Sequence, residues 1–407
     1  MKIIRFLSLL LAAILMMSLC GCGTTTVEAY TETDGGGVIA VTNNADTTAT
    51  VTEVAETTET EKTVSLDFAA AFAKHDPEDI VFTVDGTGVT WQELFYEVVY
   101  YSSYISMAED RAITDWNEAC SLFQDAEGKY YTYGTAVLQN AVTYLKQYHI
   151  MYDHLTAAGV EYSDASRAEV EALRQSTIDD SFDGDEQAFI DYLESMYCTE
   201  DLWMWFNQVD AMYAMDGFNT LYGEFGSKLS DAEVMDYAAG DEDGAWTEYV
   251  QLRLIWLYED EDGETSSEPV TAEEILKALD AAGDKEKAFE EQYALYNEEP
   301  AMDHFPGGWC VYRGDTEDAI YEAALELEDG AYTAVEVDGG QVVVMRVPID
   351  PDGGVYFDES TETLYTLRYY AAWQAYSELI NGEGGWIDSA EAGWAEGFED
   401  FTLNDVF

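Results

Sequence analysis

The hydrophobic periodicity of this 407-residue chain changes near Trp246. Before that residue, apolar side chains recur every three or four positions, as they do along one face of a helix. After it, the segment from Tyr249 to Leu257 (YVQLRLIWL) follows a period of two, which is typical of a strand. A chain that uses both periods in separate segments needs helices and a sheet, so the sequence predicts an α+β fold.

The segment before Trp246 is predicted to be almost entirely helical. A short strand over 80–84 and a turn at Asp85-Gly86 come first, and Thr90 is placed to cap the next helix. The apolar face of that helix is formed by Leu94, Val98, Tyr101 and Ile105. Ser230 and Glu233 form a capping box that opens a short helix. Between these two, helices are predicted over 134–158, 164–179, 185–196 and 199–222.

The segment after Trp246 has a definite order of elements. Turn residues at Asp338-Gly339-Gly340 join two strands into a hairpin, and capping residues separate the helices before it. The expected order is therefore β-α-α-β-α-β-β. Its members after the first strand are helices over 271–282 and 285–296, a strand over 309–312, a helix over 318–327, and strands over 332–337 and 341–347. A loop over 348–359, a long aromatic helix over 361–380 and a polar tail complete the chain.

The N-terminus has the features of an export signal. Lys2 and Arg5 flank the start of an apolar run that is too short for a confident membrane-spanning helix. The run ends in Leu19-Cys20-Gly21-Cys22, which resembles a lipobox and implies lipidation of Cys22 after removal of residues 1–21. An ordinary secretory signal and an uncleaved anchor are the alternatives. In all three cases the rest of the chain leaves the cytoplasm, and we expect it at the cell membrane, on the extracytoplasmic face.

Composition excludes several classes of partner. The chain has 83 acidic and 17 basic residues, a formal charge of −66, which argues against a phosphate-binding surface and nucleic-acid partners. High solubility through self-repulsion is the simplest interpretation of this charge. Residues 22–65 are Thr-rich, poor in aromatic residues and predicted to be a flexible linker. Three cysteines remain after it, with no disulfide or zinc spacing, so buried thiols are favoured over a bridge: Cys120, Cys198 and Cys310.

The segment from Phe289 to Leu327 (FEEQYALYNEEPAMDHFPGGWCVYRGDTEDAIYEAALEL), followed by Gly330, resembles the parvulin signature. The resemblance covers about residues 247–348. The flanks agree, because Thr83-Val84-Asp85-Gly86 followed by Val89-Thr90 is similar to the opening of PrsA/SurA-type foldases. The resemblance implies a mainly helical SurA-like chaperone lobe over 66–245, an inserted parvulin-like domain over 246–350, and a C-terminal helix and tail over 351–407 that pack on the lobe.

The chain departs from the parvulin pattern at the polar positions of the active site. The first-strand histidine of the family falls at Leu254, and the last-strand histidine falls at Val342 or Val343. The loop Asp or Cys falls near Glu299 or Pro300, and a pocket phenylalanine falls near Ile320. His304 lies in the corresponding loop, where a solvated turn residue is the more common role. We therefore predict no catalytic residue, cofactor or metal, and a substrate groove formed by Leu254, Trp256, Trp309, Ile320 and Val343.

The resemblance implies a membrane-tethered folding factor of the peptidyl-prolyl cis-trans isomerase family, with isomerase activity weak or lost. Its partners would be unfolded or newly exported polypeptides, bound on the aromatic segments 203–222 and 365–376. The N-terminal lipid would attach it to the membrane. A homodimer is compatible with this interpretation. Two alternatives remain at this stage. One is a surface lipoprotein that keeps the parvulin fold only for structure or adhesion, and the other is a solute-binding lipoprotein.

Overall fold

The computed structural model describes residues 66–125, 128–240, 248–258 and 270–407, all of which fall in one compact unit. The predicted signal peptide over 1–21, the lipidation site Cys22 and the linker over 22–65 lie outside the described residues. Within the part of the chain that is described, no helix is both long and apolar enough to cross a membrane.

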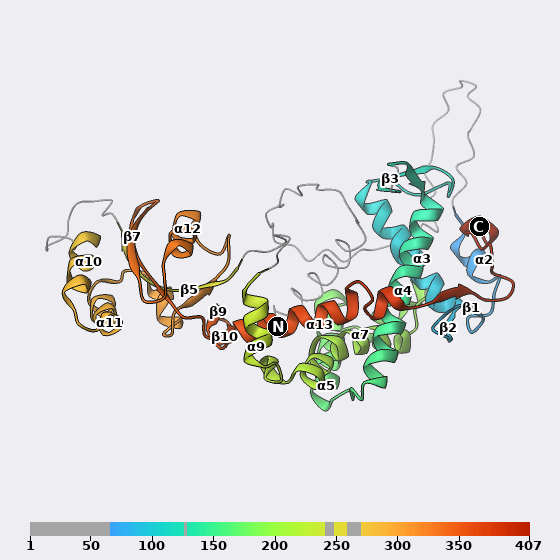
Figure 1. Cartoon of the computed structure of the whole chain (residues 1–407). Helices are drawn as coiled ribbons and strands as arrows, with labels where there is room; N and C mark the ends of the chain where they lie inside the picture. Colours follow the sequence, from blue (N-terminus) through green and yellow to red (C-terminus); the bar gives the residue numbers. More distant parts are fainter. Residues whose placement is uncertain (1–65, 126–127, 241–247, 259–269) are drawn as a thin grey trace, which may run out of the picture. The chain divides into compact units, whose positions relative to one another are not determined.

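The segment up to residue 240 is mainly helical, as the sequence predicts (Figure 1). Capping explains where its helices begin. Thr90 and Glu93 form a full capping box at the start of α3, and Ser230 and Glu233 form another at the start of α9. In chain order the elements are α2 (Phe68–Phe72), β1 (Ile80–Val84), β2 (Thr87–Thr90), α3 (Trp91–Ala108), β3 (Ala119–Gln124), β4 (Tyr130–Thr132), α4 (Tyr133–Ala157), α5 (Asp164–Ser181), α6 (Glu186–Ser195), α7 (Glu200–Ala211), the π-helix η1 (Met212–Gly217), α8 (Phe218–Tyr222), the 3₁₀ turn η2 (Glu224–Gly226) and α9 (Asp231–Ala238).

The next segment has the predicted order β-α-α-β-α-β-β, so the α+β fold class is confirmed. A single 3₁₀ turn, η3 (Pro300–His304), is added in the loop before the second strand. The elements are β5 (Val250–Tyr258), α10 (Ala272–Ala281), α11 (Lys285–Tyr296), β6 (Trp309–Val311), α12 (Asp318–Glu326), β7 (Tyr332–Val337) and β8 (Gly340–Val347).

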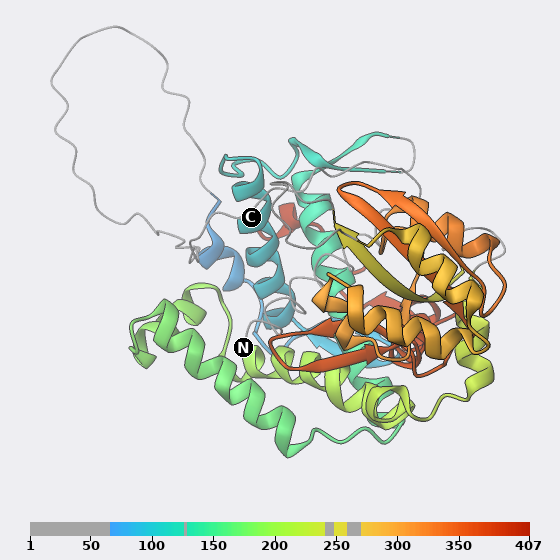
Figure 2. The same cartoon turned by 90° about the vertical axis from the view of Figure 1, so that its left-hand side faces the viewer.

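These strands belong to a six-stranded sheet with the order β10-β9-β6-β5-β8-β7. β5 and β8 pair antiparallel along their length, from Gln251 opposite Val347 to Tyr258 opposite Gly340. The two faces of the sheet bury separate hydrophobic clusters, one against α12 and the other against α10 and α11. Figures 1 and 2 show α10 and α11 on one side of the strands and α12 on the other.

The sequence prediction is wrong for the segment that follows. The predicted loop over 348–359 contains strand β9 (Gly354–Asp358), and the predicted helix over 361–380 begins late because Thr363–Thr366 forms strand β10, paired antiparallel with β9. Thr366 then caps α13 (Leu367–Asn381) by accepting a hydrogen bond from the Tyr369 N–H. The predicted polar tail contains α14 (Trp386–Ser389), the 3₁₀ turn η4 (Leu403–Asp405) and strand β11 (Ala392–Trp394), which pairs with β1.

Helix α13 contacts α9 and η2, which precede the inserted strands in the sequence. Leu367 and Ala371 of α13 share a buried cluster with Val234 and Ala238 of α9. Gly226 allows this approach, because a Cβ there would lie 2.8 Å from the Arg368 carbonyl oxygen. Residues on either side of the inserted domain are therefore packed into one core.

Arg368 links the same elements through its guanidinium group. It donates to Asp231 Oδ1 at the start of α9 (2.6 Å), to Asp352 Oδ1 (2.6 Å) and to the Leu229 carbonyl oxygen (2.7 Å), and its side chain is only 12% exposed. These hydrogen bonds raise the pKa of Arg368, so the group is held charged. The residue fixes the junction between α9, the β8–β9 loop and α13.

We expect Arg368→Ala to lower the free energy of unfolding by about 2 kcal/mol. The substitution removes the charge-assisted bonds of the guanidinium to Asp231, Asp352 and the Leu229 carbonyl oxygen, but both carboxylates are well exposed. Urea unfolding measures this change. Arg313→Ala is the matched control, because Arg313 pairs with Asp318 and Glu322 and its side chain is 44% exposed. An equal loss in the two variants would show that the junction has no special role.

Candidate functional site

The face of the sheet that packs against α12 is where the predicted groove residues lie. Alternation along β5 places Leu252 and Leu254 on this face, beside Ile320 of α12, and all three are at most 1% exposed. Trp256 and Trp309 are partly buried against the same cluster. The structure thus brings four of the five predicted residues together, but Leu254 and Ile320 form the core beneath the surface.

The fifth predicted residue, Val343, lies on the other face. It is fully buried with Ile255, Ile275 and Phe289, on the side of α10 and α11. Val342 is the other residue at which the resemblance could place the last-strand histidine of the family, and it lies on the same face as Leu254. A strand exposes alternate residues to opposite faces, so an offset of one position moves the side chain across the sheet.

The accessible end of the α12 face is aromatic. Trp256 stacks on Tyr258, with ring centroids 5.9 Å apart and an interplanar angle of 22°. The Trp256 indole N–H is buried and has no hydrogen-bond partner, whereas the Trp309 indole N–H donates to the Val355 carbonyl oxygen (2.8 Å). An unsatisfied buried donor costs about 1–3 kcal/mol. Trp256 therefore carries an uncompensated desolvation cost on this face.

Because Ile320 is fully buried, we expect Ile320→Trp to overpack the core and lower the free energy of unfolding by about 2 kcal/mol. It is not expected to act as a plug in an open groove. Leu295→Trp in the same domain is the control, because Leu295 is 67% exposed. A stable Ile320→Trp variant, measured by urea unfolding, would show instead that space exists beside α12.

A second candidate surface is a row of aromatic side chains, which we call the aromatic strip. It consists of Tyr356 of β9, Tyr365 of β10, Tyr369 and Trp373 of α13, and Phe225 of η2. The Tyr356 and Tyr365 rings stack at 6.1 Å, the Tyr365 and Tyr369 rings lie 4.8 Å apart, and the Tyr369 and Trp373 rings stack at 6.4 Å. Phe225 contacts both Tyr365 and Tyr369. Tyr356 is 54% exposed and Phe225 is 46% exposed.

The predicted client surface over 203–222 contributes much of its aromatic content to the core. Phe206, Met212, Tyr213 and Phe218 are buried. The half-buried Trp203 and Trp205 pack on other rings of the lobe. Sequence reasoning missed Tyr356 and Phe225. The signal for Tyr356 was the run of β-branched and aromatic residues in Gly-Val-Tyr-Phe-Asp, whereas Phe225 has no local signal beyond two neighbouring glycines.

Comparisons with known proteins gave matches only among solved structures. No protein-family profile matches the chain, and no curated protein matches it. PrsA from Bacillus subtilis is 16% identical, over 67% of this chain and 91% of that one, with a TM-score of 0.25. The foldase protein PrsA from Streptococcus pneumoniae is 11% identical, over 65% and 90%, with a TM-score of 0.24. A SurA-like chaperone from Campylobacter jejuni is 17% identical, over 75% and 95%, with a TM-score of 0.22.

The order of elements defines the fold of the chain. The order β-α-α-β-α-β-β, inserted between helices α9 and α13 that pack together, is the arrangement that the sequence resemblance predicted. The chain has a divergent PrsA/SurA-type fold. Its activity has to be argued from its own residues.

Within this PrsA/SurA-type fold, the histidine positions of the parvulin pattern hold aliphatic side chains. His304, the only histidine between residues 248 and 407, stacks on Phe357 with ring centroids 3.8 Å apart and an interplanar angle of 10°. Glu299 accepts hydrogen bonds from the Tyr258 hydroxyl (2.7 Å) and the Ala301 N–H (2.9 Å). Burial and this bond to Glu299 raise the pKa of Tyr258 to about 12. The α12 face is an apolar core with no histidine to assist at a carbonyl.

The remaining three histidines have structural partners. His149 Nε2 lies 2.9 Å from Glu93 Oε1, His154 packs against Trp386 with tilted rings, and His75 packs against Trp91. Across the described ranges, no group of three or more His, Cys, Asp or Glu side chains is arranged to hold a metal ion. Cys120, Cys198 and Cys310 are buried free thiols, as favoured by the sequence.

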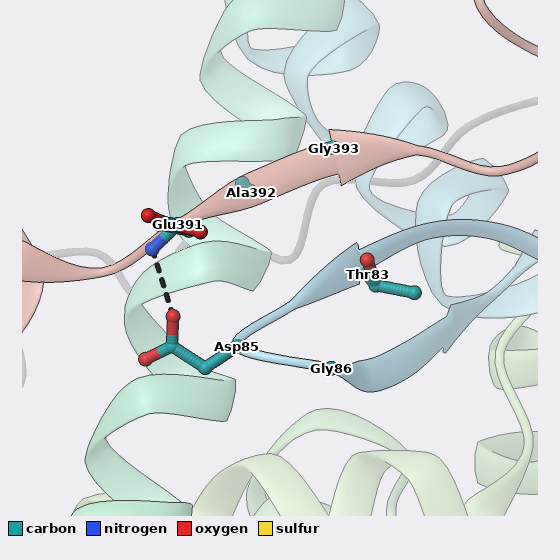
Figure 3. Close-up of a pocket in the computed structure, with 6 residues that line it drawn as sticks. All are labelled: Thr83, Asp85, Gly86, Glu391, Ala392 and Gly393. Carbon is teal, nitrogen blue, oxygen red and sulfur yellow. Dashed lines mark hydrogen bonds between the residues drawn. The ribbon is translucent and has the colours of Figure 1, made fainter.

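An open pocket of about 470 Å³ lies beside the β1–β2 turn (Figure 3). The Asp85 carboxylate accepts a hydrogen bond from the Glu391 N–H (2.8 Å), and the Asp85 N–H donates to the Glu391 carbonyl oxygen (2.8 Å). These bonds tie the turn to β11. The pocket is lined by Thr83, Asp85, Gly86, Glu391, Ala392 and Gly393. Its wall consists mainly of turn and strand backbone that is already hydrogen-bonded.

Proposed function

We propose that this protein is an extracytoplasmic folding factor that holds unfolded, newly exported polypeptides, with isomerase activity weak or lost. The observation that carries the proposal is the aromatic strip. Soluble proteins rarely expose contiguous apolar surface without a binding role, and here five ring side chains from four separate elements form one surface. Rings of this kind provide a large apolar contact area without requiring a defined client sequence.

The loss of isomerase activity is supported by the α12 face. Rotation about an X-Pro bond has an uncatalysed barrier of about 18–20 kcal/mol, and catalysis requires groups that bind the twisted amide better than the planar one. The resemblance places the family's histidines at Leu254 and at Val342 or Val343, and all three residues are at most 1% exposed. An apolar surface alone retains part of the binding without polar assistance at the carbonyl.

Tethering through Cys22 is part of the proposal and rests on the Leu19-Cys20-Gly21-Cys22 sequence. A lipid anchor would raise the effective concentration of the protein at the membrane surface, where exported chains emerge. The proposed organisation follows the sequence: signal peptide 1–21, linker 22–65, helical lobe 66–245, parvulin-like domain 246–350 and C-terminal segment 351–407. Cys22→Ser should abolish lipid labelling of the chain and release it from the membrane fraction.

Two assays on the full-length protein test the proposal. Exchange NMR on a short X-Pro peptide measures isomerisation, and light scattering measures aggregation of a chemically unfolded client. We expect suppressed aggregation with little or no acceleration of exchange. Strong acceleration would make the protein an active foldase despite its missing histidines. Failure in both assays would overturn the chaperone function and favour a structural role.

A further inference from the structure

We infer that the aromatic strip selects positively charged polypeptide segments, those in which Lys and Arg are interspersed with apolar residues. This inference rests on the proposed function and adds the chemical class of the client. It comes from three observations: an uncovered ring pair on the β9–β10 hairpin, a strained and exposed phenylalanine beside that pair, and an excess of acidic residues around both.

The β9–β10 hairpin uses its two faces differently. Phe357 stands opposite Leu364, and on that face Phe357 stacks on His304 of the inserted domain. Tyr356 stands opposite Tyr365 on the other face, where the two rings stack on each other. Tyr356 remains 54% exposed. The hairpin is therefore held in place through one face and presents a tyrosine pair on the other.

Phe225 extends this surface at a cost in backbone strain. Its φ of 52° lies in the left-handed region, which is unusual for a bulky residue. Such strain is generally offset by burial of the side chain, yet Phe225 is 46% exposed. Gly223 and Gly226, both with positive φ, hold the turn in which Phe225 lies. Strain retained at an exposed aromatic residue indicates a binding role.

The charge around the strip is strongly negative. The hairpin segment 352–366 contains Asp352, Asp358, Glu359 and Glu362 but no Lys or Arg. Beside it, the Arg368 guanidinium is occupied by Asp231 and Asp352, and the Lys228 ammonium donates to the Thr220 carbonyl oxygen. Burial, followed by the charge of Asp358, raises the pKa of Tyr365.

Tyrosine faces flanked by carboxylates are suited to cationic ligands. A Lys or Arg side chain over a Tyr ring gains a cation–π attraction and can pair with a neighbouring carboxylate at the same time. The apolar residues of the same segment would cover Phe225 and Trp373. Acidic segments would be repelled, because the whole chain carries a charge of −66.

The test uses the full-length protein in zwitterionic lipid nanodiscs and three unstructured peptides of equal length. The first has alternating Lys and aromatic residues, the second replaces each Lys with Glu, and the third keeps Lys but replaces each aromatic residue with Ser. Fluorescence anisotropy gives Kd at about 0.1 M and about 1 M salt, where the Debye length is about 10 Å and about 3 Å. We expect the first peptide to bind at least about tenfold more tightly than either of the others at low salt. Its advantage over the Glu peptide should shrink at high salt.

Matched variants locate the site. Phe225→Ser with Tyr356→Ser should weaken binding of the first peptide about tenfold, and Glu359→Gln with Glu362→Gln should reduce only its preference over the Glu peptide. Leu295→Ser, exposed elsewhere on α11, is the control that should change neither. Equal affinity for the Lys and Glu peptides, or full binding of the Lys peptide that lacks aromatic residues, would overturn the inference. If such a result accompanies normal suppression of client aggregation, the proposed function stands and only the charge selectivity fails.

Discussion

The protein is expected to be more stable at pH 5 than at pH 8, and Asp210→Asn is expected to remove much of the difference. Asp210 of α7 accepts a hydrogen bond from the Tyr148 hydroxyl (2.6 Å) in the interior of the helical lobe. Burial raises the pKa of the Asp210 carboxyl from 3.8 to about 6, although the bond from Tyr148 lowers it. The buried carboxyl thus favours its protonated form.

The direction of this pH dependence follows from proton linkage. When the pKa in the folded state is above the pKa in the unfolded state, the folded protein binds the extra proton, and stability falls as pH rises between the two values. For Asp210 that window is about pH 4 to 6, and the total loss is about 3 kcal/mol, of which about 1.4 kcal/mol falls between pH 5 and pH 8. Glu97 of α3 acts in the same direction, because burial raises its pKa well above 4.5. Repulsion among the surface carboxylates adds to the trend.

The buried carboxyl of Glu93 in the same lobe has the opposite effect on stability, but at lower pH. Burial pushes the pKa of Glu93 up, but the hydrogen bond and charge of His149 and the bonds from Thr90 outweigh it, so the pKa is lowered. Glu93 therefore loses its contribution only as pH falls below about 4.5, and it does not affect the comparison between pH 5 and pH 8.

Urea unfolding at pH 5 and pH 8 measures the effect in the wild type, Asp210→Asn and Glu97→Gln. Both variants should gain stability at pH 8 relative to the wild type and should show a flatter pH dependence. Glu194→Gln, an exposed acid on α6, is the control and should keep the wild-type dependence. A wild type that is more stable at pH 8 than at pH 5 would contradict the prediction, and an unchanged slope in Asp210→Asn would assign the trend to surface charge instead.

The sequence predicted best what neighbouring residues determine. The capping boxes of Thr90 with Glu93 and of Ser230 with Glu233 involve residues three positions apart, and both are present. The turn at Gly339 likewise joins two strands that are adjacent in the sequence. These local signals were enough to give the order of elements in the inserted domain.

The errors of the sequence prediction arise where contacts between residues far apart in the sequence determine the structure. Strand β9 joins the large sheet through a single parallel pairing of Trp309 with Gly354, which lie 45 positions apart. The predicted helix over 199–222 is interrupted by the π-helix η1, in which Gly217 packs closely against Leu155 and the Tyr376 hydroxyl. Neither partner can be identified from the local pattern.

The candidate site shows the same division. The family pattern located Leu254, Ile320 and the two tryptophans on one face, because strand and helix positions follow from local periodicity. It misplaced Val343 by one position, which is enough to reverse the face. The family pattern also does not predict how exposed each side chain is. In the structure, Leu254 and Ile320 belong to the core, whereas Tyr356 and Phe225 of the aromatic strip are exposed.

Removal of residues 402–407 is expected to lower the free energy of unfolding of the helical lobe by about 5 kcal/mol. Leu403 and Val406 are each 2% exposed. The Phe407 ring lies 4.8 Å from Phe68 and 5.1 Å from Trp116, and it stacks on Phe95 of α3 at 6.1 Å. The six residues fill an aromatic core made by the first described segments of the chain, and their loss would expose those rings to water.

The inserted domain should be largely unaffected by this deletion. Its two hydrophobic clusters consist only of residues between 250 and 347, so no contact of the tail contributes to them. Limited proteolysis followed by mass spectrometry should show early cleavage in the helical lobe and a surviving fragment that contains β5 to β8. Asn404→Ala is the control, because Asn404 is exposed and bonds only with Asn117 across the surface. If the truncated protein resists proteolysis as well as the wild type does, the aromatic core forms without the tail. If the helical lobe and the inserted domain are cleaved at the same rate, the two unfold as one cooperative unit.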